Sequence, residues 1–140
     1  MELHLGCGHL GEAEFVRGFE ECELGHAAFR HADHIRLAWI YVSRHGGREA
    51  EALLLAGIRK MALHANAPQK FLYTTTVAWT RLVAAAQGNG SAANSFSDWI
   101  ASHPELLDRH LLGRYYSPGR LETPEARSGW VEPDLAPLEI

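Results

Sequence analysis

The stretch from residue 29 to residue 42, FRHADHIRLAWIYV, most constrains what this chain can fold into. As a helix it carries apolar side chains on nearly every side, and a helix of that kind is normally buried at the centre of a domain. Ionisable groups in such a place are costly unless they are paired, hydrogen-bonded or bound to something. The residues that need an explanation are therefore His31, Asp33, His34 and Arg36.

The spacing of apolar residues along the rest of the chain predicts an all-α fold, a compact bundle of about five to seven helices around that central helix. Helices are expected from residue 12 onward and over 26–43, 48–65, 70–87 and 96–100. Two further helices are expected, one opened by the capping box at 102–105 and a short one capped by Thr123. A strand is the alternative for 70–87, because the run Thr-Thr-Thr-Val favours one. The tail from Trp130 to Leu138 contains prolines and is expected to be extended and to pack on the surface.

A chain of 140 residues suits one domain, which we place at 12–140. Residues 1–11 contain three glycines and show no helical period, so they read as a flexible N-terminal extension. A soft-metal site made of His4, Cys7 and His9 is the alternative. Gly57, inside the helix expected at 48–65, indicates close packing against a neighbouring helix.

Charge and hydropathy exclude several function classes. A net charge of -4 without a block of Lys and Arg argues against nucleic-acid binding. No apolar run is long enough to span a membrane, and the start lacks the layout of a signal peptide. Two cysteines form no disulfide framework and suggest a reducing compartment, so a cytoplasmic location is expected.

His31 and His34 stand three residues apart, close enough on one side of a helix for one ion to reach both imidazoles. A divalent transition metal is therefore a candidate cofactor, and a carboxylate, another His or a ligand atom would have to complete its coordination shell. A metal-free pair could instead act as general acid and base near neutral pH, together with Tyr73. A third alternative is that both are core histidines bonded to backbone or hydroxyl groups.

Arg36 could hold an anionic group of a substrate by bidentate hydrogen bonds. The plainer alternative is a buried ion pair with Asp33, at helical i,i+3 spacing. Tyr73, Thr76 and Thr80 would share one helix face and could line a pocket beside the two histidines. Threonine hydroxyls more often bond to carbonyls of their own helix, which is the alternative here.

Over residues 12–138, the chain resembles a family of small uncharacterised bacterial helical proteins. The strongest part of the resemblance is F-x-H-x-D-H-x-R-L-A-W-x-Y at 29–41, and further segments follow in the same order at 70–79, 106–117 and 126–135. The resemblance implies an all-α domain and brings no established activity with it.

The resemblance also implies a third histidine in the helix expected at 70–87, where similar sequences tend to read Lys-aromatic-His-Glu/Ala-Thr. This chain has Leu72 at the histidine position, followed by Tyr73. A metal site would therefore have lost that ligand or recruited another, for which His64 and Tyr73 are the candidates.

These observations predict a small-molecule enzyme or biosynthetic accessory enzyme with a histidine-centred pocket between the helices at 26–43 and 70–87. His31, His34 and Tyr73 would be catalytic, while Arg36 and Thr76 would bind the substrate. A non-catalytic module that binds a metal or a small ligand is the first alternative. The second is a helical interaction domain, with a homodimer formed through residues 53–65.

Overall fold

The computed structural model describes residues 10–24, 29–88 and 95–140, and all regular structure in these ranges is helical. The α-helices are α1 (Glu12–Glu20), α2 (His31–His45), α3 (Gly47–His64), α4 (Tyr73–Gln87), α5 (Phe96–Ala101) and α6 (Pro124–Ser128). The predicted all-α class is confirmed, and the strand alternative for residues 70–87 is wrong. Residues 1–9 of the expected N-terminal extension lie outside the described residues.

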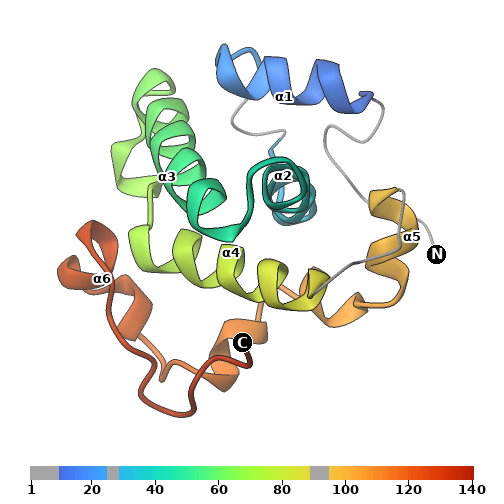
Figure 1. Cartoon of the computed structure of the whole chain (residues 1–140). Helices are drawn as coiled ribbons and strands as arrows, with labels where there is room; N and C mark the ends of the chain where they lie inside the picture. The colour runs from blue at the N-terminus through green and yellow to red at the C-terminus, as the bar shows by residue number, and fades with distance from the viewer. Residues whose placement is uncertain (1–9, 25–28, 89–94) are drawn as a thin grey trace.

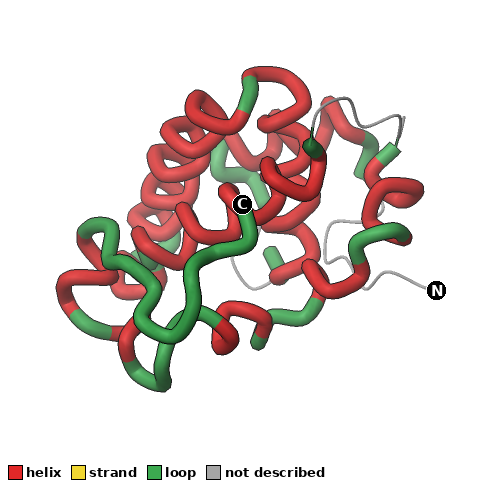
Figure 2. Tube along the Cα trace, turned by 60° about the horizontal axis from the view of Figure 1, so that its bottom comes forward, coloured by secondary structure: helices red, strands yellow, loops and turns green. Residues whose placement is uncertain are grey.

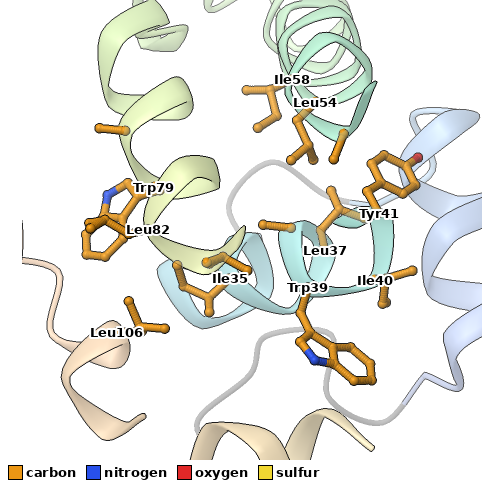
Figure 3. Packing of buried hydrophobic residues seen from close by; sticks show 14 of the residues in the cluster. Ile35, Leu37, Trp39, Ile40, Tyr41, Leu54, Ile58, Trp79, Leu82 and Leu106 are labelled. Atoms are coloured by element: carbon orange, nitrogen blue, oxygen red, sulfur yellow. The ribbon is translucent and has the colours of Figure 1, made fainter. Parts of the chain in front are cut away.

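The helix α2 is the centre of the bundle, as predicted. Figure 1 views it almost end-on, with α1, α3, α4 and α5 arranged around it. Buried side chains lie on every side of the helix axis; they are Asp33, Ile35, Leu37, Ala38, Trp39, Ile40 and Tyr41. Figure 3 shows the hydrophobic side chains labelled on α2 extending from different sides of the helix. A helix covered on all sides has no polar face, which explains why its sequence lacks one.

α2 begins at His31, later than the expected start at residue 26. The reason is a capping interaction: the Asp33 carboxylate accepts a hydrogen bond of 2.8 Å from the backbone N–H of Arg30. An acidic side chain at this third helical position satisfies a backbone donor outside the first turn and fixes where the helix begins. Phe29 and Arg30 precede the helix and belong to the loop.

The contact between α1 and α3 depends on Gly57. A methyl group placed on Gly57 would lie 2.5 Å from the ring of Phe19, so the ring occupies the space of a side chain. The close packing predicted at this glycine is confirmed. A glycine inside a helix costs about 1 kcal/mol against alanine, and here the buried ring of Phe19 offsets that cost.

The region after α5 differs from the prediction. In place of the helix expected from residue 102, the chain forms two short 3₁₀ turns, η3 (Pro104–Leu107) and η4 (Leu111–Arg114). Between them Asp108 accepts a hydrogen bond from the backbone N–H of His110, 2.9 Å long. Such a local turn competes with helix continuation. The leucines of this region still reach the core: Leu106, Leu111 and Leu112 are buried.

Both α5 and α6 begin just after a residue whose side chain caps the helix, and the cap at Thr123 was predicted. Ser95 accepts a hydrogen bond from the N–H of Asp98, and Thr123 accepts one from the N–H of Ala126. Beyond α6 the chain runs without helix to residue 140, beside the helices as Figure 2 shows. Trp130, Val131 and Leu138 pack against the core. In the described ranges no helix is both long and apolar enough to cross a membrane.

Candidate functional site

His31, the first residue of α2, lies between α4 and η3. Its ring centroid is 4.5 Å from that of Trp79, and its Nε2 lies 2.9 Å from the carbonyl oxygen of Leu106; Figure 3 shows both neighbours on the side of α2 that carries Ile35. A carbonyl only accepts, so Nε2 carries the proton and Nδ1 of the neutral ring is an acceptor. Burial lowers the pKa of His31, and the hydrogen bond to Leu106 opposes that shift.

His34 lies one turn further along α2, beside Phe29 at 6.4 Å between ring centroids. Burial, and then the nearby charge of His31, lower the pKa of His34 to about 4. The imidazole is therefore neutral at physiological pH. Its Nε2 is buried and has no hydrogen-bond partner among the described residues. A buried ring nitrogen without a partner is uncommon and costly, which makes this atom notable.

Arg36 and Asp33 both hold parts of the fold together. The Nη2 of Arg36 donates a hydrogen bond of 2.8 Å to the carbonyl of Leu10, and the guanidinium lies 4.6 Å from the ring centroid of Phe15. Arg36 therefore anchors the start of α1 to α2. The carboxylate of Asp33 caps α2. The predicted substrate-binding role of Arg36 stays a prediction.

The threonines of α4 follow the plainer alternative. The hydroxyl of Thr76 donates to the carbonyl of Leu72, and the hydroxyl of Thr80 donates to that of Thr76, both at 2.8 Å. Thr74 was not selected as a site residue from the sequence, yet its hydroxyl makes hydrogen bonds to a segment far away in the chain. It is fully buried, donates to the carbonyl of Gly129 at 2.6 Å and accepts from the N–H of Val131 at 3.0 Å. Thr74 thus fixes the C-terminal segment on α4.

The expected third metal ligand is exposed. His64 is the last residue of α3, and its side chain lies on the surface. In the part of the chain that the structure describes, no three His, Cys, Asp or Glu side chains gather closely enough to hold a metal ion. His4, Cys7 and His9, the alternative site of the sequence, lie outside that part. The pair of His31 and His34 thus has no third protein ligand among the described residues.

A cavity of about 710 Å³ opens between α3, the 3₁₀ turn η2 (Pro68–Lys70), the start of α4 and α6. Its volume falls in the range of small-molecule sites, about 300–1,000 Å³. Figure 1 shows α6 next to the start of α4, at one end of the bundle. Apolar and polar side chains both line the cavity: Ala52, Leu55, Ala56, Arg59, Leu63, Pro68, Gln69, Phe71, Tyr73, Arg127 and Ser128.

Of the predicted site residues, only Tyr73 lines this cavity. Tyr73 and Trp79 are six residues apart on α4, or about 240° around the helix axis. Since His31 packs on Trp79, the structure separates Tyr73 from the histidine pair. The ring of Tyr73 lies edge-on to that of Phe71, at 6.5 Å between centroids. Its hydroxyl makes no hydrogen bond with a described residue.

Two arginines line the cavity. From the sequence, Arg127 could be either a salt-bridge or a ligand residue, and Arg59 was not selected. Arg127 donates from Nε to the carbonyl of Glu122 at 3.0 Å and from Nη1 to that of Gln69 at 2.9 Å. Arg59 makes no hydrogen bond or ion pair with a described residue. The signal that could have identified this site is a second face of α3 in which small and apolar residues surround Arg59: positions 52, 55, 56, 59 and 63 recur at helical spacing.

The comparisons with known proteins found no matching family model, no matching curated protein and no matching solved structure. The resemblance to a bacterial helical family therefore stays a prediction.

Proposed function

We propose that this protein binds a small molecule with an apolar body in the cavity between α3, η2 and α6. The observation that supports the proposal is the cavity itself, about 710 Å³ and bounded by side chains from four elements. Leu55, Leu63, Pro68 and Phe71 provide apolar walls, and burying a ligand against them removes apolar surface from water. Tyr73 and Gln69 provide the few polar groups that orient ligands in sites of this kind.

A neutral fluorescent ligand tests this proposal. N-phenyl-naphthylamine is apolar and fits within the volume of the cavity. Its fluorescence intensity increases when it moves from water to an apolar environment. We expect saturable binding to the wild-type chain and loss of binding in the double variant Ala52→Phe/Ala56→Phe, whose rings occupy the cavity. Both alanines are exposed to the cavity, so the variant is expected to fold.

The matched control is Ala101→Phe, which adds the same ring to an exposed alanine of α5 away from the cavity. Its affinity for the dye should equal that of the wild type. Equal dye binding by the wild type and the filled variant would refute the proposal, because the dye would then bind elsewhere.

A second candidate function, acid–base or metal chemistry at His31 and His34, has its own observation. The Nε2 of His34 is buried without a partner, and the bond from His31 to Leu106 leaves the Nδ1 of His31 free to accept or to coordinate. Backbone carbonyls commonly orient metal-binding histidines in this way. An enzyme or accessory enzyme would use this pair, as the sequence predicts, with water or substrate completing the shell of a divalent metal.

Titration calorimetry with Zn²⁺, on protein without a histidine tag, tests this second candidate. We expect one binding event that is lost in His34→Leu and kept in His64→Leu, which removes an exposed imidazole. Binding that survives His34→Leu would place the metal elsewhere and remove the support for this candidate.

A further inference from the structure

We infer that the cavity between α3, η2 and α6 takes an anionic amphiphile, a molecule with an apolar body and a carboxylate, sulfonate or phosphate group that Arg59 binds. This inference rests on the proposed function and adds the chemical class of the ligand. It starts from the charges around the cavity, which are unbalanced: the described lining residues include two arginines and no Asp or Glu.

Arg59 is poised for such a group because nothing in the described chain neutralises it. It makes no hydrogen bond or ion pair there. Its neighbours one turn away on α3 are Leu55, Ala56, Ala62 and Leu63, so no acid on its own helix is placed to pair with it. A guanidinium beside an apolar wall is a binding group for the two oxygens of a carboxylate or similar anion.

Arg127 strengthens the positive potential from the opposite wall and is already held in place. Its Nε and Nη1 are used by the carbonyls of Glu122 and Gln69, so the side chain spans from α6 to η2. Both partners are neutral carbonyls, so these bonds leave its positive charge uncompensated. A fixed charge costs little side-chain entropy when a ligand binds. Arg127 contributes positive potential in this scheme, and Arg59 makes the contact with the anion.

The apolar part of the ligand follows from the remaining wall. Leu55, Ala56, Leu63, Pro68 and Phe71 form a surface that a hydrocarbon chain or a ring system can cover. The hydroxyl of Tyr73 makes no hydrogen bond with a described residue and can donate to a second oxygen of the anionic group. A ligand with a neutral head would leave Arg59 without a partner, so the site discriminates by charge.

Two dyes that differ by one charged group test the inference. Anilinonaphthalene sulfonate and N-phenyl-naphthylamine share the same ring system, and only the first carries a sulfonate group. We expect wild-type protein to bind the sulfonate about tenfold more tightly than the neutral dye at low salt, a ratio that corresponds to about 1.4 kcal/mol. The preference should shrink as ionic strength rises, because salt screens a partly exposed charge.

The variant Arg59→Gln should remove that preference, because it should weaken binding of the sulfonate dye far more than binding of the neutral dye. Because Arg59 bonds to nothing in the described chain, the variant is expected to fold, and its unfolding curve checks this. The matched control is Arg48→Gln, the same substitution on an exposed arginine of α3 that does not line the cavity. It should bind both dyes like the wild type.

The outcomes separate the two claims. Equal affinity for both dyes, with no effect of Arg59→Gln, overturns the inference and leaves the proposed function standing. An equal loss of affinity for both dyes in Arg59→Gln also overturns it, since Arg59 would then shape the cavity without distinguishing charged from neutral ligands. Binding of neither dye overturns the proposed function and the inference together.

Discussion

The surroundings of α2 and the outer face of α3 are opposite in character. Around α2 the side chains fill space in every direction, and the ionisable groups Asp33, Arg36 and His31 bond to backbone atoms within the protein. On the outer face of α3 a cavity is left open, and its Arg59 bonds to nothing in the described chain. The ionisable residues that the sequence marks as site candidates on α2 thus make hydrogen bonds that hold the fold together. The open site is made of residues that look ordinary.

The difference shows what each kind of signal reports. A helix that combines histidines with apolar residues is conspicuous because burial makes its polar groups costly. A cavity depends on which side chains leave space unfilled between separate elements, and the sequence of a single segment does not determine this. Sequence chemistry therefore points to α2, while the hollow lies where α3, η2 and α6 meet.

The largest effect should come from removing core volume beside α2. Leu37 is fully buried, and Leu37→Ala should lower the free energy of unfolding by about 2–5 kcal/mol. The paired change on the cavity side is Leu63→Ala, where the side chain is 55 % exposed and the cost should stay within about 0.5 kcal/mol. Urea unfolding followed by tryptophan fluorescence measures both. Similar costs for the two variants would contradict the contrast between packed and open regions.

Acid should weaken the α2 region next. The folded pKa of His34 is about 4 against an ordinary value of 6.5, so between these values the unfolded chain binds a proton that the folded one does not. The contribution of neutral His34 to the free energy of unfolding is therefore fully present above pH 6.5. It is lost as the pH drops toward 4, and the loss is on the order of 3 kcal/mol. The lowered pKa of His31 adds a slope of the same sign.

Urea unfolding across this pH range measures that loss. In the variant His34→Leu the free energy of unfolding should change less steeply with pH than in the wild type. The variant His64→Leu, which removes an exposed imidazole, should keep the wild-type pH dependence. Identical slopes in the wild type and His34→Leu would mean that His34 is protonated in the folded protein as it is in the unfolded chain.

The smallest effect should come from enlarging an alanine of the cavity. Ala56→Leu places new methyl groups in open space, so the free energy of unfolding should change by less than about 0.5 kcal/mol. The same change in the core, Ala38→Leu, adds volume where the side chain is fully buried and should cost about 1–3 kcal/mol. Thermal unfolding of the two variants compares them directly. A large loss in Ala56→Leu would show that the cavity is not available space.

Much of the fold was predictable because local rules decided it. The apolar circumference of α2, the packing role of Gly57 and the caps at Ser95 and Thr123 each follow from residues close in sequence. The expected helix after Ser102 failed because the turn at Asp108 competes with it, and helical spacing of leucines does not reveal such competition.

The site was less predictable than the fold. The sequence selected Tyr73 as a site residue but placed it in a pocket with the two histidines, whereas the structure places it at the cavity. Arg127 reaches the cavity through carbonyls of Gln69 and Glu122, the first of which is far away in the chain. Contacts over such separations are set by the packing of α6 against α4, which the pattern of residues within either helix does not specify.

The way in which α6 is held has a consequence for the entry and exit of a ligand. This outer wall contributes one buried side chain, Ala126, and is otherwise tied to the bundle by hydrogen bonds of Arg127 and, through Gly129 and Val131, of Thr74. Each such bond is worth about 1 kcal/mol, far less than the packing around α2. We therefore expect local opening of α6 to cost less free energy than global unfolding, so that, in the proposed function, this opening would set how long a ligand stays bound.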